Sequence, residues 1–206
     1  MTPAEFRFAL KMSKQVTHAP ELSYNRQLLA GFFTAARSLG PKLGPILLQF
    51  PPSFRLDKID QLSQFLSNLP PDLRFAVEVR HQSWYTRQGD GQLALAVLLK
   101  EFGICWAATD FPGLPGEVVT TTDFLMVRWI GQNGSFMHHN REQIDRTAEL
   151  TAWEERIRSS AFGIQDIYGF FNNDYSGFPP QTANKFKKII GLSIQEFDLP
   201  RQATLF

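Results

Sequence analysis

Short apolar segments alternate with segments of helical periodicity, and this alternation constrains the fold more than any other feature of the chain. Six segments have the length and composition of buried strands, and they cover residues 6–11, 46–50, 75–79, 104–109, 124–129 and 167–171. They are apolar on both faces, which is typical of a parallel sheet covered by helices. The sequence therefore predicts an α/β fold.

Apolar residues recur at helical spacing in five segments, which cover residues 22–39, 59–69, 93–102, 150–157 and 183–190. Gly40 and Pro41 are expected to end the first helix, and Asp57 is expected to cap the second. No internal repeat or linker interrupts the pattern. We expect one barrel-like domain over residues 1–192, followed by a mobile tail over residues 193–206.

Composition narrows the classes of protein that this chain can belong to. It has 206 residues with 21 Lys and Arg against 20 Asp and Glu, so its net charge of +1 provides no general field for nucleic acid. Its 19 Phe lie mainly in apolar runs, which favours a bulky core. The single Cys105 excludes an internal disulfide, and no segment has the pattern of an export signal or a membrane span. A cytoplasmic location is expected.

Polar residues follow the predicted strands where each strand ends. In a parallel sheet these carboxyl ends share one rim, where ligands bind in barrels and open sheets alike. Any one such residue is equally well explained as a solvated strand end, and the recurrence after all six strands favours a functional rim. The candidates are Lys11, Gln49, Glu78, Arg80, His81, Asp110, Arg128, Asn172 and Asn173.

The densest polar cluster is Glu78-Val79-Arg80-His81. Residues 78 and 80 lie on the same side of a strand, so Arg80 would keep Glu78 ionised, and His81 could act as a general acid or base. We take Glu78, His81 and Asp110 as candidate catalytic residues, and the other rim residues as ligand-binding. The alternative is an ion pair that braces the barrel, with His81 in a loop.

The sequence gives little support for a metal site, a catalytic nucleophile or a nucleotide-binding site. Glu78, His81, Asp110 and His18 are suitable metal ligands, but they lack a local ligand motif, and no metal site is predicted. Cys105 lies in the middle of a strand, where a thiol is usually inert. The chain has no nucleophile elbow, Walker loop or dinucleotide-binding fingerprint, so the cofactor stays unknown.

Six blocks of the sequence form a recognisable set, at residues 6–11, 17–18, 43–54, 76–84, 168–173 and 183–184. Together they resemble the YecE-like family, also known as domain of unknown function 72. The resemblance implies a TIM-type (β/α) barrel whose rim carries the polar candidates named above. It implies no activity, because the family has none assigned.

The chain departs from the family pattern in two places. The family begins with two βα units that have no counterpart before Met1-Thr2-Pro3, so an incomplete barrel with about six strands is expected instead of eight. Met1 would then be an internal methionine of a longer or degraded reading frame, and the two open sheet edges would favour pairing. Ile130 stands where the family has a histidine before Gly131, so activity that needs this imidazole would be absent.

The segment Gln202-Ala203-Thr204-Leu205-Phe206 resembles the peptide by which bacterial DNA repair and replication proteins bind the sliding clamp. A mobile tail can donate an extended peptide in which Gln202 forms hydrogen bonds while Leu205 and Phe206 fill an apolar pocket. Alternatively, the last two residues pack on the barrel.

Three functions remain open from the sequence. The first is a hydrolase or binder of phosphate- or sugar-containing ligands derived from nucleic acid, with Lys11, Arg80 and Arg128 as anion clamps. The second is a clamp-tethered accessory protein without catalysis. The third is a truncated, inactive relative. Whether the chain is an enzyme is left open.

Overall fold

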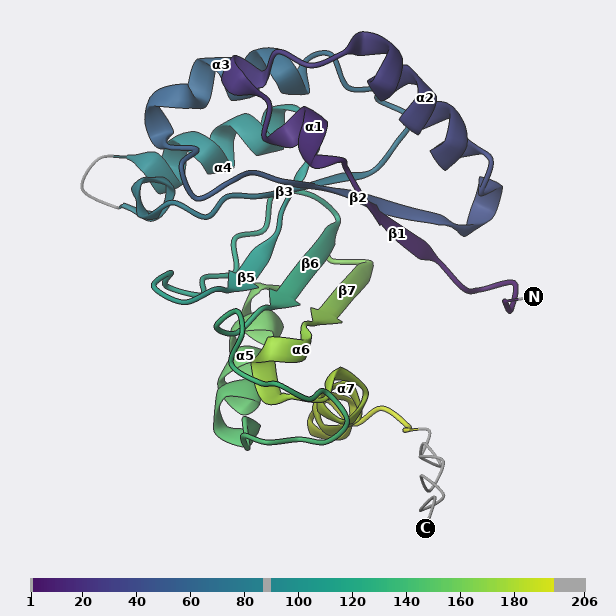
Figure 1. The fold of residues 1–206 in the computed structure, drawn as a ribbon, viewed down its shortest axis with the longest axis vertical. Coiled ribbons are helices and arrows are strands. Elements are labelled where there is room, and N and C mark those ends of the chain that lie inside the picture. The colour runs from purple at the N-terminus through teal and green to yellow at the C-terminus, as the bar shows by residue number, and fades with distance from the viewer. Residues whose placement is uncertain (1, 87–89, 195–206) are drawn as a thin grey trace.

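All the strands of the described residues run parallel in one strongly curved sheet (Figure 1). The structure is a computed structural model that describes residues 2–86 and 90–194. Its strands are β1 (Phe8–Lys11), β2 (Leu43–Gln49), β3 (Phe75–Glu78), β4 (Cys105–Trp106), β5 (Ala108–Asp110), β6 (Phe124–Trp129) and β7 (Asp166–Phe171).

The strand order follows the order of the sequence. One part of the sheet has the order β1-β2-β3-β4 and the other has the order β5-β6-β7. The two parts are continuous because Ala107 alone separates β4 from β5, and its backbone N–H donates to Val77 O at 2.9 Å. The β4–β5 segment therefore acts as a fourth strand shared by both parts. This sequential parallel order is that of a (β/α) barrel, here incomplete and open between β1 and β7.

Helices connect the strands and cover the convex side of the sheet (Figure 1). They are α1 (Lys14–Thr17), α2 (Arg26–Arg37), α3 (Ile59–Leu66), α4 (Gly91–Glu101), α5 (Thr147–Ser160), α6 (Asn173–Ser176) and α7 (Pro179–Ile189). Short 3-10 turns cover Pro20–Leu22, Gly40–Lys42, Leu56–Lys58 and Gln82–Tyr85. In Figure 1, α2, α3 and α4 lie over β1 to β3, whereas α5 and α7 lie beside β5 to β7.

The side chains of the strands divide between an outer core and an inner one. The outer faces pack on the helices in two clusters, one around Leu48, Val77 and Leu62, the other around Val127 and Trp129. The inner faces meet in a smaller apolar cluster inside the half-barrel. It is formed by Leu47, Ala76, Cys105, Ala107, Phe124 and Met126, with Tyr168 packed against it.

The predicted α/β class and the incomplete barrel are confirmed, and the predicted strands lie within a few residues of the observed ones. Two local predictions are wrong. Asp57 does not cap α3, because a 3-10 turn over Leu56–Lys58 precedes that helix and leaves Lys58 at its N-cap. The strand predicted over residues 104–109 is broken at Ala107, where the sheet bends. No helix in the described ranges is both long and apolar enough to cross a membrane.

Candidate functional site

Polar side chains form a layer above the inner apolar cluster, at the carboxyl ends of the strands. Inward-facing positions alternate along each strand, so the residue two positions after an inner apolar residue also faces inward. Gln49 follows Leu47 and Arg128 follows Met126 in this way. Glu78 likewise follows Ala76. Gln49, Glu78 and Arg128 therefore lie on the inward face near the carboxyl ends of β2, β3 and β6.

Glu78 lies at the centre of this layer and bonds two guanidinium groups. Its side chain is 0% exposed, Arg80 Nε donates to its Oε1 at 2.6 Å, and Arg128 Nη1 donates to its Oε2. The prediction that residues 78 and 80 point together is confirmed. Arg80 also stacks over the ring of Phe111, with 4.7 Å to the ring centroid. Both arginines are thereby held in fixed orientations.

Lys11 and Gln49 extend the layer toward the open edge of the sheet. Lys11 Nζ donates to Gln49 Oε1 at 2.8 Å, and Gln49 itself is buried. Partial burial, together with the positive charges of Arg128 and Arg80, lowers the pKa of the Lys11 ammonium. His18 lies near the same positive charges. Burial and the charges of Lys14 and Lys11 lower the pKa of its imidazole. Positive charge is therefore in excess at this rim.

Two hollows open beside Arg128 and Phe170, which line both of them. The inner hollow has a volume of about 150 Å³, and Lys11, Leu47 and Met126 are among its other lining residues. The outer hollow, of about 280 Å³, is lined by residues 128, 130 and 170–173. At about 30 Å³ per water molecule, the inner hollow is large enough for a ligand of only a few non-hydrogen atoms.

Asp110 faces the outer side of the sheet, away from Glu78. It pairs in register with Trp129, a member of the outer core, and its Oδ2 accepts a hydrogen bond from Trp153 Nε1 of α5 at 2.8 Å. It is the last residue of β5, and the inward position is taken by Thr109, which pairs with Arg128. Asp110 does not join the polar cluster, and Thr109 is a rim residue that sequence reasoning missed.

His81 and Asn172 act locally as helix caps. The ring Nδ1 of His81 accepts from the backbone N–H of Ser83 at 3.0 Å and lies 2.9 Å from its hydroxyl, which fixes the turn after β3. Asn172 Oδ1 accepts from the backbone N–H of Asp174 at 3.2 Å, at the start of α6. Asn172 and Asn173 also line the outer hollow.

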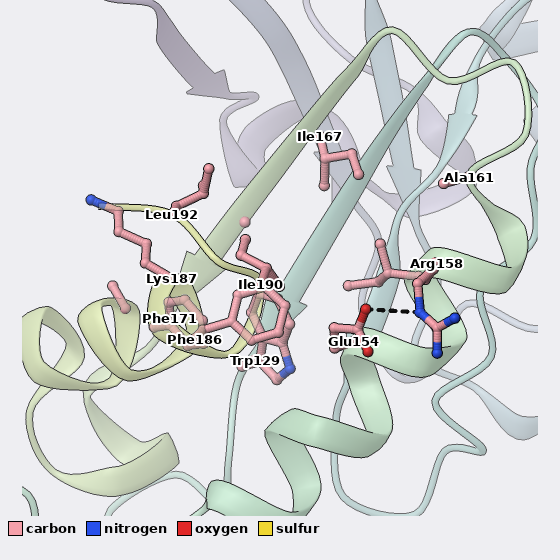
Figure 2. Close-up of a pocket in the computed structure, with 13 residues that line it drawn as sticks. Trp129, Glu154, Arg158, Ala161, Ile167, Phe171, Phe186, Lys187, Ile190 and Leu192 are labelled. Carbon is pink, nitrogen blue, oxygen red and sulfur yellow. Dashed lines mark hydrogen bonds and ion pairs between the residues drawn. The ribbon is translucent and has the colours of Figure 1, made fainter. Parts of the chain in front are cut away.

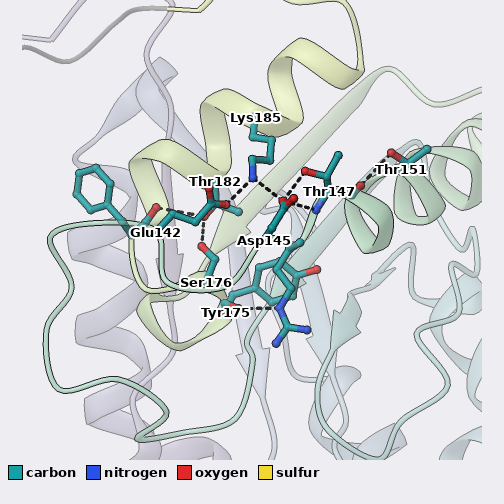
Figure 3. Close-up of polar contacts among 10 residues, drawn as sticks. Glu142, Asp145, Thr147, Thr151, Tyr175, Ser176, Thr182 and Lys185 are labelled. Atoms are coloured by element: carbon teal, nitrogen blue, oxygen red, sulfur yellow. Dashed lines mark hydrogen bonds and ion pairs between the residues drawn. The ribbon is translucent and has the colours of Figure 1, made fainter.

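The long loop after β6 is fixed to α6 and α7 by a polar network (Figure 3). Lys185 of α7 donates to Glu142 Oε1 and Asp145 Oδ1, both at 2.7 Å. Arg146 Nε donates to Tyr175 O at 3.0 Å. This network holds the loop against α6 and α7 without using the charged residues of the rim.

Three candidates from the sequence analysis remain, namely the thiol of Cys105, a metal site and the C-terminal tail. Cys105 is 1% exposed, and burial raises the pKa of its thiol to about 12, as expected for an inert core cysteine. Within residues 2–86 and 90–194, no three His, Cys, Asp or Glu side chains form a group that could hold a metal ion. The tail residues Gln202, Leu205 and Phe206 lie outside the described residues.

Sequence reasoning also missed an apolar groove between α5 and α7. It has a volume of about 470 Å³, and its floor includes Trp129, Phe171 and Phe186 (Figure 2). The Glu154–Arg158 ion pair at 3.0 Å lies at its edge. No local sequence pattern could have revealed it, because the groove depends on how two separate helices flank β7. It lies on the outer side of the sheet. It shares no lining residue with the inner hollow and only Phe171 with the outer one.

Comparison with known proteins places this geometry in a family. The chain matches the family described as "Protein of unknown function DUF72" over residues 1–204. The chain belongs to the DUF72 family. The "UPF0759 protein YecE" of Escherichia coli K12 is 27% identical to it over 161 residues, as is the protein of the same name from Escherichia coli O157:H7. The match covers 68% of this chain and 58% of each relative, so the chain spans less than two thirds of their length.

Solved structures of DUF72 proteins share the fold. The crystal structure of the family member from Thermotoga maritima MSB8 superposes with a TM-score of 0.73 at 27% identity, and covers 92% of this chain and 75% of that one. The member from Enterococcus faecalis V583 gives a TM-score of 0.74 at 21% identity, with 94% of this chain and 77% of that one covered. The YecE-like assignment and the incomplete TIM-type barrel are thus confirmed.

Proposed function

We propose that this DUF72 chain binds a small anionic ligand, with a phosphate or carboxylate group, in the rim hollows beside Arg128. The observation that carries the proposal is the convergence of Lys11, Arg80 and Arg128 around Glu78. Three cations around one carboxylate leave an excess of positive charge, although the whole chain is nearly neutral. A planar guanidinium in a partly dry pocket is well suited to bind two oxygens of an anion.

Glu78 is assigned a positioning role in this proposal. It is fully buried, and each of its oxygens bonds an arginine, so it orients the two guanidinium groups that receive the ligand. A general acid or base needs access to the proton that it transfers. The predicted catalytic roles of Glu78, His81 and Asp110 remain predictions, to be tested by a screen of phosphoester hydrolysis with Glu78→Gln and His81→Gln variants.

Anion binding is tested by titration calorimetry at low salt, with inorganic phosphate and a small carboxylic acid as separate probes. Arg128→Gln is expected to weaken binding by roughly tenfold, because a charge-assisted hydrogen bond is lost from the pocket. Arg37→Gln is the matched control, since Arg37 pairs with Asp72 on the exposed surface. Equal binding by both variants, or no binding of either probe by the unaltered chain, would disprove the proposal.

The clamp-binding tail is a second proposal, supported by the sequence Gln202-Ala203-Thr204-Leu205-Phe206. A labelled peptide of residues 198–206 is expected to bind a bacterial sliding clamp with a Kd on the order of micromolar. The control peptide carries alanine at residues 202, 205 and 206. If both peptides bind alike, the tail has no specific affinity for the clamp. Binding that the control loses would make nucleic-acid fragments the first ligands to test in the rim hollows.

A further inference from the structure

Lys11 differs chemically from the two rim arginines. Its primary amine becomes a nucleophile when uncharged, whereas a guanidinium keeps its charge. It is the last residue of β1, and it lines the inner hollow together with residues of β6 and β7. A small molecule that enters this hollow therefore meets an accessible amine.

The surroundings of Lys11 favour the uncharged amine and hold it in place. Its Nζ is oriented by the 2.8 Å hydrogen bond to Gln49 Oε1, a neutral acceptor that does not require an ammonium ion. Burial and the charges of Arg128 and Arg80 lower the pKa of the amine. Partial desolvation beside cationic groups is the environment in which lysines react with carbonyl compounds.

We propose that Lys11 forms an imine with an aldehyde or ketone that also carries a carboxylate or phosphate group. This inference rests on the proposed function, because Arg128 would hold the anionic group while the carbonyl carbon approaches Lys11. Leu47, Met126 and Phe170 line the same hollow and would limit the access of water to the imine.

The chemistry balances without a further reactant. The lone pair of Lys11 Nζ forms a bond to the carbonyl carbon, and the carbonyl oxygen takes up a proton, which gives a carbinolamine. The C–O bond then breaks and the hydroxyl group leaves as water, while the nitrogen gives up its second proton overall. No atom changes its oxidation state, because a C=N bond replaces a C=O bond.

The test traps the imine in the full chain. The protein is incubated with glyoxylate, an aldehyde, or with pyruvate, a ketone, each of which supplies a carboxylate and is small enough for the inner hollow, and the imine is reduced with borohydride. Peptide mass spectrometry then locates the adduct. We expect it at Lys11 and expect inorganic phosphate to reduce its yield. Lys11→Arg should lose the adduct, whereas Lys14→Arg, at an exposed lysine on the neighbouring helix α1, should retain it.

Different results would overturn the imine proposal and the anion-binding proposal. Adducts spread evenly over the exposed lysines, or an unmodified Lys11 in a chain that binds phosphate, would overturn the imine alone. A chain that binds no anion by calorimetry would overturn the proposed function and this inference with it. Thermal unfolding of Lys11→Arg beside the unaltered chain ensures that a lost adduct reflects the missing amine, because the conservative variant keeps the charge and the fold.

Discussion

The two parts of the curved sheet are covered to different extents. Over β1 to β4, the outer core is continuous, and residues such as Leu62, Trp84 and Leu95 are 0% exposed. Beside β5 to β7, the outer core is smaller and the apolar groove separates α5 from α7. The edge strand β7 leaves Ile167 50% exposed and Phe170 38% exposed.

This difference shows how stability and binding are divided in the chain. The first part supplies most of the close packing that resists unfolding. The second part supplies Arg128 and the lining of the outer hollow, and it shares the inner hollow with β1 and β2 of the first part. The polar layer joins the two parts, since Glu78 of β3 bonds Arg128 of β6.

The largest effect is expected for truncation of a core phenylalanine in the better-packed part. Phe65→Ala on α3, where Phe65 is 3% exposed, should lower the free energy of unfolding by about 4 kcal/mol because a well-enclosed cavity forms. Phe186→Ala on α7 should cost only about 2 kcal/mol, since Phe186 already borders the open groove. Urea unfolding followed by circular dichroism measures both, and equal losses would remove the difference between the two parts.

A somewhat smaller effect is expected for the group that joins the two parts. Glu78→Gln should lower the free energy of unfolding by about 3 kcal/mol, because two largely buried guanidinium groups lose their shared carboxylate. Anion binding by Arg128 should weaken in parallel, which calorimetry can measure. Asp72→Asn is the control, since it breaks an exposed pair with Arg37 that is screened by water and salt. A Glu78 variant as stable as this control would show that the two parts are held together by other contacts.

Two glycines in the loop after β6 should differ in how much stability they lose when replaced by alanine. Gly131 has a φ of +71°, and a Cβ there would collide with the backbone of Asp174, so Gly131→Ala should cost about 2 kcal/mol. Gly134 has a φ of +77° but nothing within 4 Å, so Gly134→Ala should cost only about 1 kcal/mol. Thermal melts of both variants compare these values. The same loss in both would mean that Gly131 needs only its backbone angle.

The smallest effect concerns acid stability of the second part. Hydrogen bonds from Lys185 and Thr147 lower the pKa of Asp145 to about 2. A lowered carboxyl pKa stabilises the fold above the unfolded value of 3.8, and this contribution disappears as the pH falls toward 2. Asp145→Asn should therefore lower Tm slightly at pH 6, and its effect should shrink as the pH falls through 2. A difference that persists in acid would exclude ionisation as its cause.

Part of the site could be predicted from sequence because the carboxyl ends of parallel strands share one rim. Gln49, Glu78 and Arg128 were placed at this rim because they lie at the ends of apolar strands, and the structure brings them together. Asp110 was misjudged because it was placed at the rim only by its position after an apolar strand. Cys105, Ala107 and Thr109 alternate on the inner face, so Asp110 falls on the outer face, where it bonds Trp153.

The sequence by itself determined the order of strands and helices, the family and the polar rim. These features follow from short-range periodicity and from residue types, which each segment carries with it. Only the tertiary structure decided that both oxygens of Glu78 are occupied, that His81 caps a turn, and that Lys11 faces an open hollow. Such facts depend on distances between segments far apart in the chain, and these distances are set by packing of the whole sheet.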